Sequence, residues 1–213
     1  MNYNPFDYLA DEYEAWFIRN KVLFQSELLA LKQVVPVDKT GVEIGIGSGI
    51  FAEPLGIRFG IDPSEKMLEY ARRRGLEVQN GVAENLPYEN ESFDFDVLIN
   101  ALCFVTDPNL ALQEAHRILK SDGEIIIAIL DKETQFGRFL ENNKKKSQFY
   151  KHARFFSVPE IIDLLEKHNF RITQTLQTLE DPATRKIENP LEGFGKGSFV
   201  VVKGVRQEFK SED

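Results

Sequence analysis

The sequence predicts an α/β fold in which a mostly parallel sheet carries helices on both faces. Strand-like segments alternate with segments of helical periodicity, and several strand-like segments are apolar throughout, as strands buried on both faces are. A further observation is the stretch "GVEIGIGSGI" at residues 41–50, where three glycines alternate after an apolar run. Glycine inside an element costs about 0.5–1 kcal/mol relative to alanine. A tight turn needs one or two glycines, so three indicate a loop whose backbone closely approaches a ligand.

The composition of the 213 residues limits the possible functions. Hydrophobic residues make up 42 %, enough for one large domain, and the longest apolar run, Ile125–Leu130, is too short for a membrane span. The acidic N-terminus does not read as a signal peptide, and a lone cysteine, Cys103, predicts no disulfide framework and a cytoplasmic location. The net charge of −8 argues against nucleic acid as substrate, and the run Lys144–Lys146 is expected to be a solvated face.

The first elements follow from apolar spacing. Residues 7–35 place apolar side chains three and four apart and are expected to form a helix that Pro36 closes. The apolar segment 41–46 reads as a buried strand before the glycines. A short helix at 50–55 then leads to a second strand at 57–61.

Turn and cap residues define the next elements. Residues 62–75 read as a helix that Ser64 or Asp62 caps and that Gly75 ends. A short strand at 76–81 follows it.

The middle of the chain carries the clearest strand signal. After a loop at 82–92, the segment 93–105 alternates and then becomes fully apolar, so we expect a strand. Residues 107–123 form a helical pattern that opens with Asp-Pro and stops at a glycine. The segment 124–130, "EIIIAIL", is the most evident strand of the protein.

The pattern changes after residue 131. Residues 132–156 are polar and contain six aromatic residues. A helix at 158–170 precedes two strands, 171–179 and 197–205, which have no helix between them and therefore predict an antiparallel pair at the sheet edge. Their connection, 181–197, is too long for a hairpin turn, and connections of that length are often functional.

The order strand, glycine turn, helix and acid near the end of the next strand predicts a nucleotide site. The glycines let the backbone approach the ligand, and the helix N-terminus presents free amides. Asp62, 17 residues after Gly45, is placed to accept hydrogen bonds from ribose hydroxyls. The alternative for Asp62 is a helix cap.

Motifs in the first two thirds of the chain carry a family resemblance. The loop reads E-x-G-x-G-x-G from Glu43 to Gly49, whereas dinucleotide enzymes use G-x-G-x-x-G. It resembles motif I of the class I S-adenosylmethionine-dependent methyltransferases. Four further stretches resemble segments of the small-molecule (type 11) group: "FDYLADEYEAWF", "FGIDPSEKMLEYAR", "GVAENLPYENESFDFDVLINALCFV" and "ALQEAHRILKSDGEIIIAILD". The likeness covers residues 6–131 well and the remainder loosely.

The resemblance implies a more detailed architecture. It implies a Rossmann-like seven-stranded sheet of order 3-2-1-4-5-7-6 with strand 7 antiparallel. Residues 1–36 would form an N-terminal helical lid and residues 37–213 the methyltransferase domain. Within that domain, residues 132–156 would be the variable segment on the substrate side.

The resemblance also assigns residues to the cofactor, S-adenosylmethionine, and its product S-adenosylhomocysteine. Those expected at the cofactor are Glu43, Gly45, Ile46, Gly47, Gly49, Asp62, Pro63, Met67, Ala83, Glu84 and Asn100. The glycines would pass under the methionine part, Glu43 and the Asn100 carbonyl would hold its ammonium, and Asp62 would bind the ribose. Met67 would pack on the adenine, with core packing as the alternative. Many relatives have an acid where this chain has Val82, so either Glu84 bonds the adenine or packing alone holds it.

The acceptor is expected above the C-terminal ends of the fourth and fifth strands. The expected walls are Tyr13, Trp16, Phe17, Cys103, Phe104 and aromatic residues of 132–156, with core packing as the alternative for each. In-line transfer needs alignment and exclusion of water, and it needs a base only if the acceptor must lose a proton. No catalytic residue is evident; His152 is the one histidine considered as a base, and no metal site is expected.

These observations favour a methyltransferase that acts on a small, uncharged or cationic molecule. Two alternatives remain: a cofactor-binding regulatory or partner protein without turnover, and another nucleotide-binding enzyme, including one that uses NAD. The acceptor's identity and the oligomeric state are left open.

Overall fold

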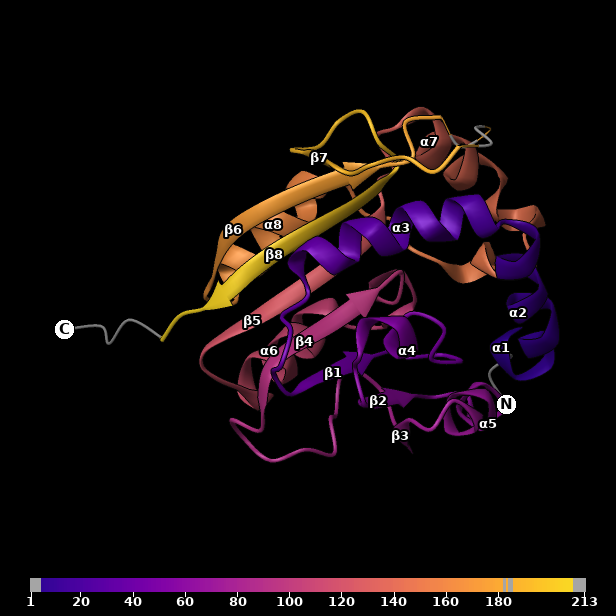
Figure 1. Cartoon of the computed structure of the whole chain (residues 1–213). Coiled ribbons are helices and arrows are strands. Elements are labelled where there is room, and N and C mark those ends of the chain that lie inside the picture. The colour runs from indigo at the N-terminus through magenta and orange to yellow at the C-terminus, as the bar shows by residue number, and fades with distance from the viewer. Residues whose placement is uncertain (1–4, 182, 184–185, 209–213) are drawn as a thin grey trace.

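The computed structural model describes residues 5–181, 183 and 186–208, and its centre is an eight-stranded sheet (Figure 1). The strands lie in the order β3-β2-β1-β4-β5-β8-β6-β7. Their bounds are β1 Gly41–Ile44, β2 Phe59–Asp62, β3 Glu77–Asn80, β4 Phe93–Ile99, β5 Leu119–Leu130, β6 Phe170–Thr178, β7 Leu191–Glu192 and β8 Phe199–Arg206. β1 to β5 pair in parallel, whereas β8 runs antiparallel to β5 and β6. The expected fold class and order of the seven main strands are confirmed.

β7 is an addition to the seven expected strands. It is two residues long and pairs antiparallel with the end of β6, where Leu176 faces Glu192. It forms within the long connection 181–197. It therefore covers only the last residues of β6 at this sheet edge.

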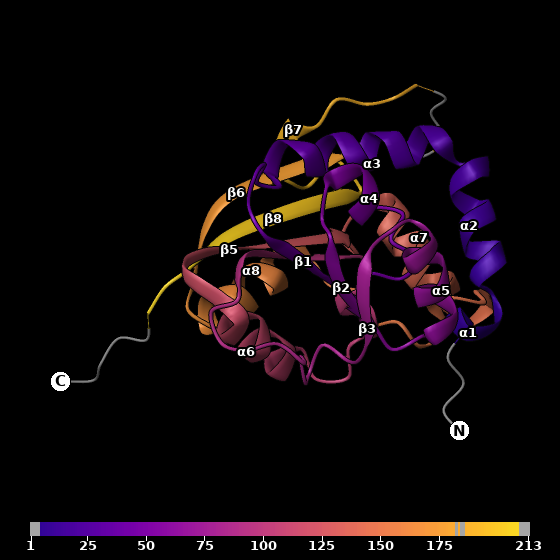
Figure 2. The ribbon, with the colours of Figure 1, turned by 60° about the horizontal axis from the view of Figure 1, so that its bottom comes forward.

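Helices cover both faces of the sheet, as expected (Figure 2). Their bounds are α1 Pro5–Tyr8, α2 Ala10–Arg19, α3 Lys21–Val34, α4 Ala52–Leu55, α5 Glu65–Arg73, α6 Pro108–Ile118, α7 Gln135–Asn143 and α8 Val158–Lys167, with the 3-10 turns η1 Leu102–Phe104, η2 Lys144–Lys146 and η3 Tyr150–His152. Side chains of α6 and α8 belong to the core on one face. Side chains of α2, α3, α4 and α5 belong to the core on the other.

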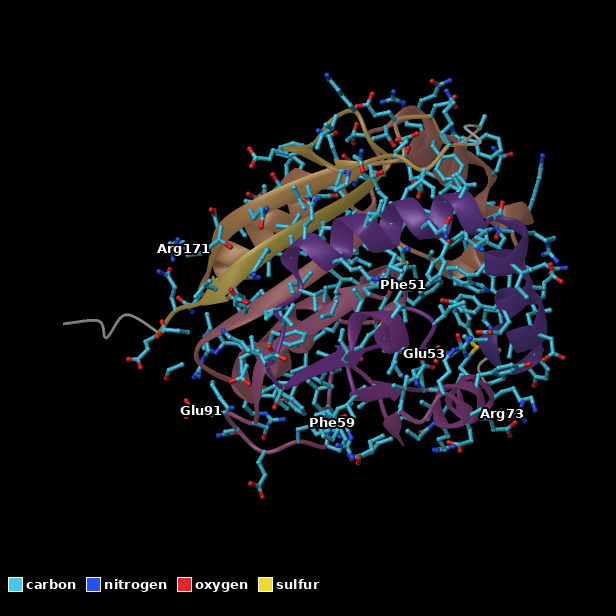
Figure 3. All side chains as sticks on the ribbon, viewed as in Figure 1. Phe51, Glu53, Phe59, Arg73, Glu91 and Arg171 are labelled. Atoms are coloured by element: carbon cyan, nitrogen blue, oxygen red, sulfur yellow. The ribbon has the colours of Figure 1, made fainter. Side chains whose placement is uncertain are left out.

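The single N-terminal helix expected at 7–35 is wrong, because the chain breaks at Leu9 and Asn20 into α1, α2 and α3. Asn20 leaves the helical conformation (φ −112°, ψ 36°), and its side-chain amide donates to the Trp16 carbonyl at 2.9 Å. The break turns α2 so that Phe17 packs edge-on against Phe24 and Phe51. Phe51, labelled in Figure 3, thus lies beneath the N-terminal helices.

Two boundaries in the middle of the chain also differ from expectation. α6 ends at Ile118 rather than at Gly123, because Leu119 is already extended and pairs with Phe93 of β4. β4 ends at Ile99, because Asn100 adopts a positive φ of 51° and turns the chain into η1. The end of β4 lies at the carboxyl edge of the sheet, next to the glycine loop, whereas the start of β5 at Leu119 lies at the opposite edge, beside the start of β4.

Candidate functional site

The glycine loop joins β1 to α4 and is held by the neighbouring strand. The amides of Gly45 and Ile46 both donate to the Ile61 carbonyl at 2.9 Å. Gly45, Gly47 and Gly49 have φ values of 78°, 53° and 76°, a conformation that side chains with a Cβ rarely adopt. The loop is therefore a preformed feature of the backbone.

The three glycines have different neighbours. A Cβ at Gly45 would lie 2.6 Å from the Ala101 Cβ, and one at Gly49 would lie 2.3 Å from the Leu76 Cδ1, so both positions exclude a side chain by packing. A Cβ at Gly47 would lie 3.2 Å from the Met67 Cε and 3.9 Å from the Tyr13 hydroxyl. Gly47 is thus the glycine that faces the space between α5 and α2.

Asp62 ends β2 beside this loop and is 9 % exposed. Its Oδ2 accepts from the Gly47 amide at 2.9 Å and its Oδ1 from the Ser64 amide at 2.8 Å. Burial raises its pKa to about 6, and the two amides oppose that shift. Each oxygen keeps a further lone pair for a ligand hydroxyl. The helix cap is Ser64, whose Oγ accepts from the Met67 amide at 3.3 Å.

Buried oxygens without a hydrogen-bond partner at the loop include the Ser48 Oγ within it and a pair beside it, the Glu43 Oε2 and the Asn100 Oδ1. Glu43 lies on β1 and is 2 % exposed; burial first and Asp62 second raise its pKa. Leaving a buried polar group unpaired costs about 1–3 kcal/mol. The pair therefore indicates a place for a ligand with hydrogen-bond donors, such as an ammonium.

Five aromatic residues from four segments form one group above the carboxyl ends of β4 and β5, here called the aromatic cluster: Phe6, Tyr13, Phe104, Phe149 and Tyr150. Phe6 lies at its centre, with ring centroids 5.9 Å from Tyr13, 5.2 Å from Phe104 and 5.6 Å from Phe149. A cavity of about 10 Å³ beside Tyr150 has room for about one water. A larger ligand can enter only if part of the cluster moves.

Arg74, at the end of α5, ties α2 to the loop. Its guanidinium contacts the Glu14 carboxylate of α2 at 2.6 Å, the Ser48 carbonyl of the loop at 2.9 Å and the Glu53 carboxylate of α4 at 3.2 Å. Glu53 is labelled in Figure 3, where it lies between α4 and α5. The Tyr70 hydroxyl adds a second contact by donating to Asp11 of α2. These contacts hold α2 over the site.

Comparison with known proteins identifies the family. A family model described as a methyltransferase domain matches residues 42–127. A crystal structure from Thermotoga maritima, described as a SAM-dependent methyltransferase and possible histamine N-methyltransferase, is 48 % identical with a TM-score of 0.93 and covers 95 % of this chain and 99 % of its own. The chain belongs to the class I S-adenosylmethionine-dependent methyltransferase family. An uncharacterised protein of Methanocaldococcus jannaschii is 40 % identical to this methyltransferase, over 93 % of this chain and 97 % of its own length. An uncharacterised protein of Mycobacterium tuberculosis is 34 % identical, over 96 % of this chain and 74 % of its own length.

The residues at the loop fit the cofactor that this methyltransferase family uses. The Glu43 Oε2 and the side-chain Oδ1 of Asn100 are without a partner and could accept from an amino-acid ammonium, whereas the Asn100 main-chain carbonyl, the group expected there, accepts from the Cys103 Sγ. Asp62 has a lone pair left on each oxygen for ribose hydroxyls, and the absence of a side chain at Gly47 keeps the backbone accessible beside Met67 and the Tyr13 hydroxyl. The assignment of these side chains to the cofactor stays a prediction.

The other residues expected at the cofactor have structural contacts as well. Ile46 and Ala83 are buried in the two cores. The Pro63 carbonyl accepts from the Asn80 side chain at 3.0 Å. Glu84 directs its Oε1 to the amides of Thr106 and Asp107, at 2.8 and 3.1 Å. That carboxylate oxygen is thus already engaged on the loop before α6.

The residues expected on the substrate side fall into two groups. Tyr13 and Phe104 belong to the aromatic cluster. Burial raises the pKa of the Cys103 thiol to about 12, so it is neutral, and its Sγ donates to the Asn100 carbonyl at 3.2 Å. Phe17 is packed in the core, and Trp16 is 37 % exposed.

The remaining candidates for chemistry are few. His152 is exposed, outside the aromatic cluster. Within the described ranges, no group of three or more His, Cys, Asp or Glu residues could hold a metal ion. No helix among the described residues is long and apolar enough to cross a membrane.

Three further residues in and around this site were not predicted from the sequence. Phe6 precedes the helical pattern that was recognised, and Arg74 carried no signal beyond its position in the last turn of a helix. Glu27 is an acid on the apolar face of α3 and is 4 % exposed. Its spacing to Ala30, Leu31 and Val34 is the signal that could have identified it.

Proposed function

We propose that this protein transfers the methyl group of S-adenosylmethionine to a small-molecule acceptor. The observation that carries the proposal is the position of Tyr13. Its hydroxyl lies over Gly47 in the loop, and its ring packs against Phe6 and Phe149 of the aromatic cluster. The cofactor half of the site and the aromatic half therefore share a wall. When bound, the cofactor supplies an electrophilic methyl group; the chain supplies orientation and a dry enclosure.

We further propose that the N-terminal helices act as a lid. α1 lies beside α5 in both views, and α2 is fastened to the loop through Arg74 (Figures 1 and 2). In this proposal residues 1–36 contain the lid, residues 37–213 form the catalytic domain, and residues 132–156 contribute Phe149 and Tyr150 to the acceptor side. Removal of residues 1–20 should leave a folded core that binds cofactor weakly and transfers no methyl group. Undiminished methyl transfer by that truncated chain would contradict the proposal that the N-terminal helices act as a lid.

The acceptor in this proposal is small and uncharged or cationic, and the enzyme works in the cytoplasm. The net charge of −8 opposes a polyanion such as nucleic acid. The Thermotoga maritima structure is described as a possible histamine N-methyltransferase, which motivates testing amines first. The Glu84 Oε1 is engaged on the loop before α6, so in this proposal packing rather than that oxygen holds the adenine.

The test separates the proposal from its alternatives. Calorimetry should show S-adenosylmethionine and S-adenosylhomocysteine bound in the micromolar range, about −8 kcal/mol, with no binding of NAD. Cofactor carrying a labelled methyl group should then be turned over with a panel of amines, phenols, thiols and carboxylates. If NAD binds and S-adenosylmethionine does not, the cofactor assignment is refuted. Binding without transfer to any member of the panel would favour a regulatory or partner protein.

A further inference from the structure

A second cavity opens at the edge of the sheet opposite the glycine loop. Its volume is about 620 Å³, within the range of about 300–1,000 Å³ that small-molecule sites occupy. It lies beside the starts of β4 and β5, the end of β8 and the last turns of α6 and α8. Figure 3 labels one of its residues, Glu91, on the side of the molecule opposite the N-terminal helices. Its lining includes Glu91, His116, Arg117, Lys167, His168 and Arg206.

The cavity is cationic in a chain that is acidic overall. Three of its lining residues are cations and one is an acid, whereas the whole chain has 26 Lys and Arg against 34 Asp and Glu. His116 and His168 are 4 % and 7 % exposed, and burial lowers the pKa of both, so these imidazoles add no charge at neutral pH. The local excess of positive charge favours an anion.

Two of the three cations have structural roles. Arg117 has all five N–H groups engaged, two on the Glu114 carboxylate and three on acceptors of residues 86–90. Lys167 stands in the last turn of α8, where a cation offsets the helix dipole, and its ammonium donates to the Asn109 side chain at 2.7 Å. Arg117 therefore only shapes the wall, whereas Lys167 retains two of its three donors for a ligand.

Arg206, at the end of β8, has donors that no described residue uses. Its Nη1 donates to the Glu91 carboxylate at 2.9 Å and to the Leu119 carbonyl at 2.7 Å, which engages both protons of that nitrogen. Its Nε is buried without a hydrogen-bond partner. Nε and Nη2 together form the edge with which a guanidinium binds two oxygens of one carboxylate or phosphate. The donors left on Arg206 are therefore those that a bidentate oxyanion requires.

Glu91 would compete only weakly with such an oxyanion. Its carboxylate reaches Arg206 through Nη1 alone, and its side chain is 55 % exposed. An exposed ion pair contributes little free energy, because water and salt screen it. A ligand with two or more negative charges has the advantage that it engages the free edge of Arg206 and the ammonium of Lys167 together.

We propose that this cavity binds a small oxyanion with at least two negative charges, held by the Nε–Nη2 edge of Arg206 and by Lys167. The class includes phosphate compounds and di- or tricarboxylates. No Phe, Tyr or Trp is among the described residues that line the cavity, so its ligand is recognised by charge rather than by an aromatic ring. The inference does not rest on the proposed function, because the cavity shares no residue with the glycine loop or the aromatic cluster.

Calorimetry in a low-salt buffer tests the binding, with pyrophosphate and citrate as polyanions and acetate as the monoanion. The wild type should bind one equivalent of a polyanion at least tenfold more tightly than acetate, and added salt should weaken that binding. Binding of pyrophosphate alone assigns the phosphate class, binding of citrate alone the carboxylate class, and binding of both an oxyanion selected by charge. Saturation with S-adenosylhomocysteine should leave the affinity for the polyanion within twofold.

Variants of the lining residues should change the affinity in opposite directions. Glu91→Gln removes the competing acid and should bind the polyanion about threefold more tightly, a gain that misfolding cannot produce. Lys167→Gln should bind it at least threefold more weakly. Arg206→Lys keeps the charge without the bidentate edge and should lose at least fivefold, with thermal unfolding as the check on its fold. Glu77→Gln and Lys66→Gln are the matched controls, since each residue lies in an exposed ion pair outside the cavity.

Three results would overturn the inference. The first is a wild type that binds neither pyrophosphate nor citrate. The second is displacement of the polyanion by S-adenosylhomocysteine, which would place it in the glycine-loop site instead. The third is a pair of control variants that change the affinity as much as Glu91→Gln and Lys167→Gln do, because net charge rather than the cavity would then be responsible.

Discussion

Gly47 differs from the other glycines of its loop in what its missing side chain leaves open. At Gly45 and Gly49, neighbouring atoms leave no room for a side chain. Gly47 instead faces Met67 and Tyr13. We therefore expect Gly47→Ala to lower affinity for S-adenosylhomocysteine at least tenfold, because a methyl group would occupy ligand space. Calorimetry gives the affinity and thermal unfolding the stability. The positive φ of 53° adds strain of about 1–2 kcal/mol, so some loss of stability is expected too.

The control for that strain is Gly56→Ala. Gly56 has a φ of 71°, and a Cβ there would meet nothing within 4 Å. It should lose similar stability while it retains cofactor affinity. Equal affinity losses in the two variants would show that Gly47 acts through the backbone alone.

Asp62 should make cofactor affinity depend on pH. Its pKa of about 6 means that the carboxylate is ionised above pH 6 and protonated below it. Ribose hydroxyls donate to the ionised form, so affinity should be full above pH 6 and fall by up to about tenfold per unit below it. Calorimetric titrations with S-adenosylhomocysteine from pH 5 to 8 measure this. Asp62→Ala should bind at least tenfold more weakly at pH 8, since a hydrogen bond to a charged group is worth about 1.5–3 kcal/mol.

Ser64→Ala separates ligand binding from helix capping. This substitution removes the side-chain cap of α5 but keeps the backbone amide of residue 64, which donates a hydrogen bond to Asp62. Its stability should fall by about 1 kcal/mol with cofactor affinity unchanged. A pH-independent affinity in the wild type would show that Asp62 only holds the loop.

Among single residues, Asp62 and Glu27 show what sequence patterns can and cannot predict. Asp62 stands at a fixed distance after the glycines, and that spacing was enough to place it beside the loop. Glu27 shares a helix face with apolar residues, and beyond that spacing its pattern in the sequence gives no sign that an acid is buried there.

At the scale of elements, the contact between α2 and α5 is expected to control closure of the site. Arg74 joins Glu14, Ser48 and Glu53, and its side chain is 19 % exposed. Arg74→Ala should loosen α2, raise the rate of proteolysis between residues 5 and 20, and speed dissociation of S-adenosylhomocysteine several-fold. Limited proteolysis and stopped-flow release are the measurements.

Arg72→Ala is the matched control on the same helix. Arg72 pairs with Glu65 on the surface, with its side chain 44 % exposed, and exposed pairs contribute about 0–1 kcal/mol. This variant should behave as the wild type in both assays. If Arg74→Ala also does so, α2 is held by aromatic packing rather than by the ion pairs.

Elements with their own start signals were predicted well. Asp107 caps α6, and Ser157 opens α8 with a capping box, as their local sequences indicate. The breaks at Leu9 and Asn20 were not predicted, because helical spacing continues through both and tertiary packing of Phe17 decides the turn. The early end of α6 has the same cause, since residues 119–123 gain pairing with β4.

At the scale of the whole molecule, the sheet brings the two halves of the site to one edge. The glycine loop follows β1, Asp62 ends β2, Asn100 follows β4, and the aromatic cluster lies above β4 and β5. Ligands of open parallel sheets bind at the carboxyl ends of strands where the order reverses, here between β1 and β4. The position of the candidate site therefore follows from the strand order that the family resemblance implied, whereas the aromatic cluster depends on long-range packing of α1, η1 and η3.

The overall charge should assist a cationic acceptor. The chain carries a net charge of −8. A field of this sign raises the rate of encounter with cations and falls with ionic strength, because the screening length shrinks from about 10 Å at 0.1 M salt to about 3 Å at 1 M. We expect kcat/KM for an amine acceptor to fall about threefold or more over that range with kcat unchanged. Binding of S-adenosylhomocysteine, which carries no net charge, should change less and serves as the control. A kcat/KM that is independent of salt, or tight salt-sensitive binding of RNA by the intact protein, would contradict a small cationic acceptor.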